Sequence, residues 1–189
     1  MLSDVLPLAA TLSYVIPSLR RLVSSPSISG LSSASLASLF VSSLGWFFYS
    51  LTTGLVVSAV SAVMLLGLYV FMLRSIVKAK ATVSFYLPSA LLVCMLAASL
   101  LKGLHGLAFV LGLAPLLELA QARVLFKRDV PALSSLAYAA VFLRALPWIP
   151  YALRESDTAL ILWVFSSVFT SSLLFTLLVL RRTKSSLPS

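Results

Sequence analysis

The sequence has no asparagine, one cysteine, one histidine and only five acidic residues among 189. Cys94 lies inside an apolar segment, so the chain has neither a disulfide framework nor a redox motif. His105 stands alone, which excludes a metal cluster. The acidic residues are too few for a metal site, and no Ser/His/Asp or Cys/His catalytic set can be assembled from Cys94 and His105 alone. We therefore expect neither an enzyme nor a cofactor.

Charge is scarce as well, because charged residues make up only 10% of the chain. Hydrophobic residues make up 60%, and the mean hydropathy is +1.08, which is far more apolar surface than one soluble core can bury. The net charge of +9 comes from short basic runs between apolar stretches, a pattern that suits the inner face of a membrane rather than nucleic acid. The composition predicts an all-α integral membrane protein.

The apolar stretches predict seven transmembrane helices, since a hydrocarbon core of about 30 Å needs roughly 20 helical residues. We expect these spans at Leu6–Leu22, Leu31–Leu51, Thr53–Leu73, Phe85–Leu101, Leu104–Val124, Leu133–Leu153 and Leu160–Leu180. Met1–Ala10 carries Asp4 and no basic residue, unlike a cleavable signal peptide, so we expect the first span to be retained.

One line of sequence occurs twice. The segment GLSSASLASLFVSSLGWFFYSL, residues 30–51, returns as ALSSLAYAAVFLRALPWIPYAL, residues 132–153. Aligned without a gap, the two segments share nine residues, among them the pairs Trp46/Trp148 and Tyr49/Tyr151. The repeat indicates a duplicated unit.

The distribution of basic residues predicts the orientation. Loops that share one side hold Arg20, Arg21, Arg74, Lys78, Lys80, Arg123, Lys127, Arg128, Arg181, Arg182 and Lys184. The opposite side receives only Lys102 and Arg154, the latter beside Glu155 and Asp157. By the positive-inside rule the N-terminus is extracytoplasmic and the C-terminus cytoplasmic, which requires an odd number of spans.

An odd number of spans also allows two copies of a three-helix unit to lie parallel. Two copies joined directly would be inverted in the membrane, whereas one extra helix between them makes them parallel. We expect a 3+1+3 layout with a first unit at residues 1–80, a linker helix at 81–102 and a second unit with a short basic tail at 103–189. Parallel repeats of this kind are a known transporter arrangement, with the substrate bound near the midplane between the halves.

The stretch YVIPSLRRLVSSPSISGLSSASLASLFVSSLGWFFYSL resembles the first half of a SWEET sugar transporter, of the wider PQ-loop superfamily that includes the SemiSWEETs. The shared features are a proline in the first helix, a basic turn, a Ser-Gly-Leu-Ser start of the second helix and a Trp-x-x-Tyr exit. The resemblance covers most of the chain when both halves are counted. It implies a facilitative uniporter that works by alternating access.

The resemblance also implies site residues. Sugar-binding members carry an asparagine in the third helix of each unit, about sixteen residues after the tryptophan. Here the first unit has Ala62 next to Ser61, and the second, if its loop is taken as longer, has Ser166 and Ser167. Serine lacks the paired donors of an amide, so the chain differs from the family at this point.

Trp46 and Trp148 are candidate substrate-binding residues, with Ser42, Ser61, Ser166, Ser167 and Arg144. The alternative for the tryptophans, and for the tyrosines nearer the headgroups, is an interfacial aromatic belt. The alternative for the serines is close helix packing. Pro17, Pro115 and Pro147 are candidate hinges, or else static kinks, since proline removes one helical hydrogen bond in either case.

Two charges fall within predicted spans. Arg144 lies near the middle of the sixth span and Glu118 in the fifth, where an ionised side chain needs a partner or water. They form a buried pair, or Arg144 faces the cavity and selects an anion.

The function we expect is passive transport of a sugar or another small polar solute. The alternatives are a non-transporting PQ-loop-type receptor or scaffold, or a transporter of a small organic anion or amino acid. The expected partners are a small-molecule substrate and the lipid bilayer, without nucleic acid. The sequence leaves open homo-oligomer formation and the choice between plasma membrane and endomembrane.

Overall fold

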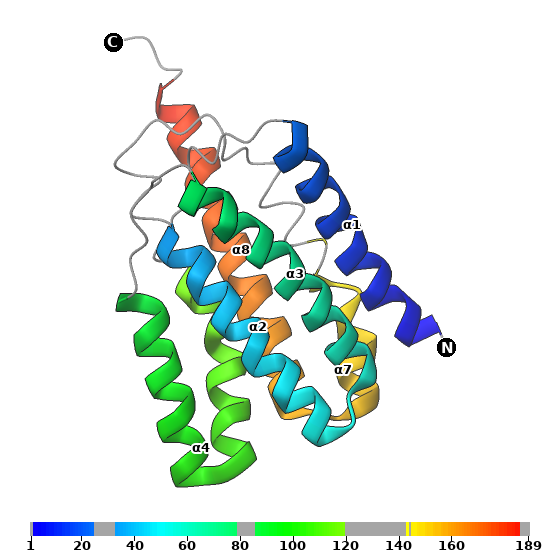
Figure 1. Ribbon diagram of the computed structural model, residues 1–189. Coiled ribbons are helices and arrows are strands. Elements are labelled where there is room, and N and C mark those ends of the chain that lie inside the picture. The colour runs from blue at the N-terminus through cyan, green and yellow to red at the C-terminus, as the bar shows by residue number, and fades with distance from the viewer. Residues whose placement is uncertain (1, 25–32, 79–85, 120–142, 144, 186–189) are drawn as a thin grey trace.

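The computed structural model describes residues 2–24, 33–78, 86–119, 143 and 145–185. Over these residues the chain is helical, with α1 at Leu2–Ser24, α2 at Ser33–Thr53, α3 at Val56–Lys78, α4 at Tyr86–Leu113, the 3-10 helix η1 at Ala114–Leu119, α7 at Trp148–Glu155 and α8 at Thr158–Ser185. Figure 1 shows them as a bundle in which α2 and α3 lie beside one another.

Five of the described helices are long and apolar enough to cross a membrane. Their outward faces carry large apolar side chains such as Phe48, Val70 and Phe165, each more than half exposed. In lipid, a helix satisfies its own backbone hydrogen bonds, which makes this the expected structure for so apolar a chain. The chain is a helical, multi-pass membrane protein, and the prediction of that class is confirmed.

The described part of the chain gives five candidate spans and not the expected seven. The predicted fourth and fifth spans belong to one 29-residue apolar stretch, Pro88–Leu116, which the backbone interrupts at Gly103 with φ 57° and ψ −141°. Figure 1 shows the two arms of α4 side by side and joined at that point. The arms approach so closely that a Cβ on Gly106 would lie 2.1 Å from the carbonyl oxygen of Ala98. Most of the predicted sixth span lies outside the described residues.

Two turns of equal length occur at one end of the bundle. α2 ends at Thr53 and α3 begins at Val56, while α7 ends at Glu155 and α8 begins at Thr158. Each boundary in the second turn lies 102 positions after its counterpart. The left-handed residue of the first turn is Gly54, with φ 77°, and that of the second is Ser156, with φ 51°.

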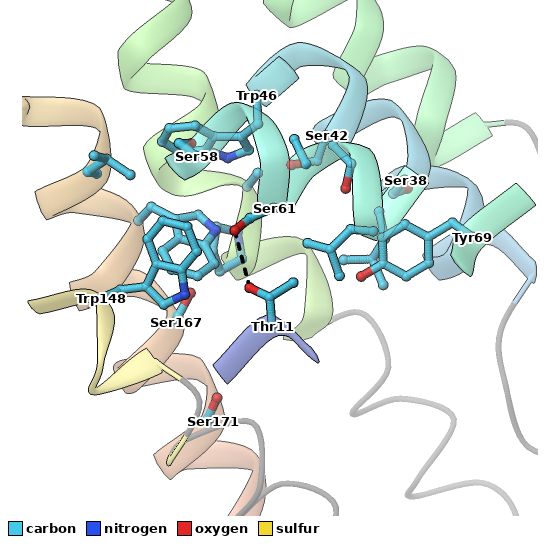
Figure 2. Close-up of a pocket in the computed structure, with 18 residues that line it drawn as sticks. Thr11, Ser38, Ser42, Trp46, Ser58, Ser61, Tyr69, Trp148, Ser167 and Ser171 are labelled. Atoms are coloured by element: carbon cyan, nitrogen blue, oxygen red, sulfur yellow. Dashed lines mark hydrogen bonds between the residues drawn. The ribbon is translucent and has the colours of Figure 1, made fainter. Parts of the chain in front are cut away.

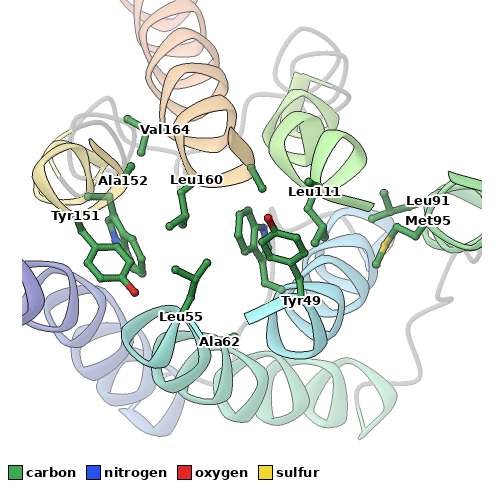
Figure 3. Packing of buried hydrophobic residues seen from close by; sticks show 14 residues of the cluster. Tyr49, Leu55, Ala62, Leu91, Met95, Leu111, Tyr151, Ala152, Leu160 and Val164 are labelled. Carbon is green, nitrogen blue, oxygen red and sulfur yellow. The ribbon is translucent and has the colours of Figure 1, made fainter. Parts of the chain in front are cut away.

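The main hydrophobic cluster joins helices from both halves of the sequence. It includes Trp46, Tyr49 and Leu55 from the first half and Trp148, Tyr151, Leu160 and Val164 from the second. Figure 3 shows Leu55 and Leu160 between the rings of Tyr49 and Tyr151. A second cluster, formed by Val15, Leu36, Leu68, Tyr69 and Met72, holds α1, α2 and α3 together.

Gly54 provides a prediction about stability. Replacing Gly54 with alanine should lower the free energy of unfolding by about 1–2 kcal/mol, because an L side chain in the left-handed region is strained. Thermal unfolding of the protein in detergent measures the change.

Gly67→Ala is the matched control, since neither glycine has any atom within 4 Å of a built Cβ and Gly67 lies inside α3. That variant should unfold at the same temperature or slightly higher. If Gly54→Ala and Gly67→Ala destabilised the protein equally, the positive φ of Gly54 would not explain the effect.

Candidate functional site

A cavity lies among α1, α2, α3, η1, the start of α7 and α8, shown in Figure 2. Eight buried serine and threonine side chains line it, together with the buried phenol of Tyr69: Thr11, Ser38, Ser42, Ser43, Ser58, Ser61, Ser167 and Ser171. Three tryptophans line it as well, Trp46, Trp148 and Trp163. Among the described lining residues there is no aspartate, glutamate, lysine, arginine or histidine. The site is therefore polar but uncharged in the part of the chain that the structure describes.

Many of the lining residues stand at equivalent positions of the two halves. Five pairs of lining residues stand 102 positions apart: Trp46 and Trp148, Ser58 and Leu160, Ser61 and Trp163, Leu65 and Ser167, and Tyr69 and Ser171. In α3 and α8 these residues recur mostly at intervals of three or four, so each helix turns one face to the cavity. Equivalent faces of the two repeated segments thus enclose the same space.

Trp163 lies between Trp46 and Trp148, the two tryptophans of the repeated segment. Its ring centroid is 6.3 Å from that of Trp46 and 5.5 Å from that of Trp148, both edge to face. Each repeat tryptophan also packs edge to face on the tyrosine three residues later, at 5.7 Å for Trp46 and 5.8 Å for Trp148. These geometries are the favourable ones for aromatic pairs. The five rings form a continuous layer across the bundle.

Several hydroxyls already have partners. The Thr11 hydroxyl donates to the Pro7 carbonyl at 2.9 Å and lies 3.4 Å from the Ser61 hydroxyl. The Ser50 hydroxyl donates to that of Ser58 at 2.8 Å, which joins α2 to α3. By contrast, the buried Trp46 Nε1 and Ser171 Oγ atoms have no hydrogen-bond partner within the described part of the chain.

Beyond the aromatic layer, polar groups connect the two halves. The Tyr49 hydroxyl donates to Asp157 Oδ2 at 2.7 Å, and Asp157 Oδ1 accepts from the backbone N–H of Leu160 at 2.9 Å. Asp157 therefore caps α8 and holds α2 with the same carboxylate. Arg154 bonds to Ser3 and Asp4 of α1 and to Glu155, and its guanidinium lies 5.2 Å from the centre of the Tyr151 ring.

Five of the predicted binding residues line the cavity: Trp46, Trp148, Ser42, Ser61 and Ser167. Ser166 is not among the lining residues, because its hydroxyl donates to the Gly112 carbonyl at 2.6 Å and joins α8 to α4. The two repeat tryptophans are only 8% and 5% exposed, so neither belongs to a lipid-facing belt.

The candidate hinges occupy three different settings. Pro115 lines the cavity from η1, Pro17 is exposed in α1, and Pro147 is the half-buried residue immediately before α7. Arg144 and the side chain of Glu118 lie outside the described residues, and so does any pair between them.

One expectation from the sequence is wrong. The second turn is not longer than the first, so the position equivalent to Ala62 is Val164, and the serines taken as its match stand two and three residues further on. The tyrosines, which are 5% and 2% exposed at Tyr49 and Tyr151, pack inside the aromatic layer rather than face outward. Extra charge in the second turn suggested extra length, but Asp157 is there as a helix cap.

Sequence reasoning also missed Trp163 and Asp157. The signal for Trp163 was the same spacing of 102, continued past the turn, which pairs it with Ser61. Asp157 had a local signal, an acidic residue immediately before an apolar helix.

Comparison with protein-family models, with curated proteins and with solved structures finds no match to this chain.

Proposed function

We propose that this protein is a facilitative transporter, similar to the SWEET family, that moves a sugar or another small uncharged polar solute by alternating access. The observation that supports it best is the cavity whose walls come from positions 102 apart in the two repeated segments. A site enclosed by equivalent helices of two units allows those units to tilt against each other around a bound solute. The described part of the lining carries no charge, which supports a neutral solute over an organic anion.

The proposal includes the 3+1+3 layout. α1, α2 and α3 form the first unit, the first arm of α4 is the linker, and the second unit comprises the second arm with η1, the segment that ends in α7, and α8. Gly103 then separates the linker from the second unit, close to the predicted boundary at residues 102 and 103. The equal turns after α2 and α7 support two copies running in the same direction.

The proposed orientation rests on the charges at the two ends of the bundle. The end that holds the start of α1 carries Asp4, Glu155 and Asp157 with Arg154. Basic residues gather where α1, α3 and α8 end, at Arg20, Arg21, Arg74, Lys78, Arg181, Arg182 and Lys184. By the positive-inside rule the first end is extracytoplasmic and the second is cytoplasmic. We refer to them below as the outer and inner ends.

The outer end of the cavity is closed in this structure. The layer of Tyr49, Tyr151, Leu55 and Leu160 lies there, with the bond from Tyr49 to Asp157 and the ion pair of Arg154 with Asp4 connecting the halves. Opening requires these contacts to break while the helices bend, for which Pro17, Pro115 and Pro147 are the proposed hinges.

Transport itself is the test. Purified protein in liposomes should accelerate the entry of a neutral polyol such as glycerol, measured by stopped-flow swelling against empty liposomes. The flux should run in either direction down the gradient and need neither a proton nor an ion gradient. A swelling rate equal to that of empty liposomes for every neutral solute would instead favour a receptor or scaffold.

A further inference from the structure

The cavity has two chemically different walls. Next to the aromatic layer, the first half provides Ser58 and Ser61 where the second half provides Leu160 and Trp163. Towards the inner end the larger side chains belong to the first half, with Leu65 and the phenol of Tyr69 where the second half provides the small Ser167 and Ser171. The duplication has therefore diverged at four of the five paired positions of the cavity.

The exchange of Ser61 for Trp163 has the largest effect on space. The Ser61 side chain ends at an oxygen close to Thr11, whereas the indole of Trp163 reaches both repeat tryptophans. The indole of Trp163 thus occupies space in the cavity that a serine at this position would leave open. The cavity is therefore narrower on the side formed by the second half of the chain.

The remaining space is small. The cavity volume is about 80 Å³. A cavity of about 150 Å³ holds one benzene, and a water molecule takes about 30 Å³ in the liquid. A solute the size of urea suits this space, glycerol, with as many non-hydrogen atoms as benzene, requires the cavity to widen, and a hexose with twelve non-hydrogen atoms requires it to widen much further.

One buried group in the cavity calls for a particular partner. Trp46 is 8% exposed, and its Nε1 atom has no hydrogen-bond partner in the described part of the chain. An indole N–H can only donate, and leaving a buried donor unpaired is costly. A ligand that satisfies Trp46 must carry an acceptor oxygen or nitrogen, which a simple ammonium ion lacks.

We propose that Trp163 sets the size limit of the site, so that the solute is a polar molecule of urea to glycerol size whose acceptor atom takes the N–H of Trp46, which has no partner among the described residues. This inference rests on the proposed transport function and narrows its substrate class. The size limit comes from Trp163, whose counterpart in the first half is the much smaller Ser61. Replacing Trp163 with serine should therefore admit larger solutes.

The test compares the full-length protein with Trp163→Ser in liposomes, using urea, glycerol and glucose. The unmodified protein should pass urea and glycerol and exclude glucose. Trp163→Ser should raise the ratio of the glucose rate to the glycerol rate at least about tenfold, the scale on which pocket size discriminates between substrates. Trp163→Phe, which keeps a ring and is the safer variant for folding, should give an intermediate glucose rate.

Glucose entry equal to glycerol entry in the unmodified protein would overturn the size limit. An unchanged ratio of glucose to glycerol in Trp163→Ser, with Trp163→Phe also unchanged, would do the same.

Binding separates this inference from the transport proposal. Titration of tryptophan fluorescence with glycerol and glucose requires no flux. Selective glycerol binding without flux would overturn transport and leave the size limit standing, and flux without size selectivity would do the reverse. Trp46→Phe, which keeps the ring and removes the N–H, should weaken glycerol binding about 3- to 10-fold, the usual worth of one hydrogen bond. Unchanged affinity would overturn the role of that donor.

Discussion

Alanine at Trp46 or at Trp148 is expected to abolish solute binding and transport. Each change removes a buried ring from the cavity wall and withdraws support from Trp163, which packs on both. Truncation of a central aromatic residue in a binding site commonly costs on the order of 2–4 kcal/mol. That corresponds to a loss of affinity of roughly 30- to 1,000-fold. The rate of glycerol entry into liposomes measures the loss of transport, and titration of tryptophan fluorescence with glycerol measures the loss of affinity.

Phe48→Ala is the matched control for Trp46→Ala. Phe48 lies two residues further along the same helix but is 56% exposed. Its removal takes an aromatic side chain from α2 without touching the cavity, and flux should persist. Loss of flux in Phe48→Ala, or full flux in both tryptophan variants when they are monodisperse, would remove the cavity from the mechanism.

Tyr49→Phe is expected to open the outer end. It deletes only the hydroxyl that bonds Asp157, and a hydrogen bond to a charged group contributes about 1.5–3 kcal/mol. If that energy is available only in the closed state, the ratio of open to closed molecules rises roughly 10- to 150-fold. A cysteine at Ala62, a buried residue of the cavity wall, should then react faster with an impermeant maleimide added from the outer side.

The accessibility experiment uses a Cys94→Ala background, since Cys94 is exposed. Thr52→Val is the matched control, because among the described residues the Thr52 hydroxyl bonds only to backbone carbonyls of its own helix, at 2.8 Å and 3.2 Å. That variant should label as slowly as the parent. Equal labelling rates in Tyr49→Phe and Thr52→Val would show that the bond to Asp157 does not hold the outer end closed.

The sequence predicted the helical membrane class because that class is set by total apolar surface, which needs no knowledge of packing. It also singled out Trp46 and Trp148, since a repeated residue marks a repeated position. It did not show that both are buried, because an aromatic ring at a helix end suits an interfacial belt equally well. Only the packing of Trp163 between them distinguishes the two cases.

The second half was harder to interpret from sequence for a different reason. RESDT looks like a longer, more polar loop than TTG, but loop length is decided by where the helices end. Asp157 caps α8 at the position that Leu55 occupies in the first turn, so charge was added without length. Correcting that one point moves Trp163 into register with Ser61, and a residue that seemed unremarkable becomes part of the site.

The two equal turns also restrict how the chain can evolve. One residue inserted after Ser156 would rotate α8 by about 100° about its axis and advance it by about 1.5 Å relative to α7. Trp163, Ser167 and Ser171 would then swing together away from the space that they share with α3. Substitutions can change the walls of the cavity one side chain at a time, whereas a single insertion or deletion at either turn removes a whole wall. Divergence between the two halves should therefore accumulate as replacements within the helices, with changes of length confined to the opposite end of the bundle.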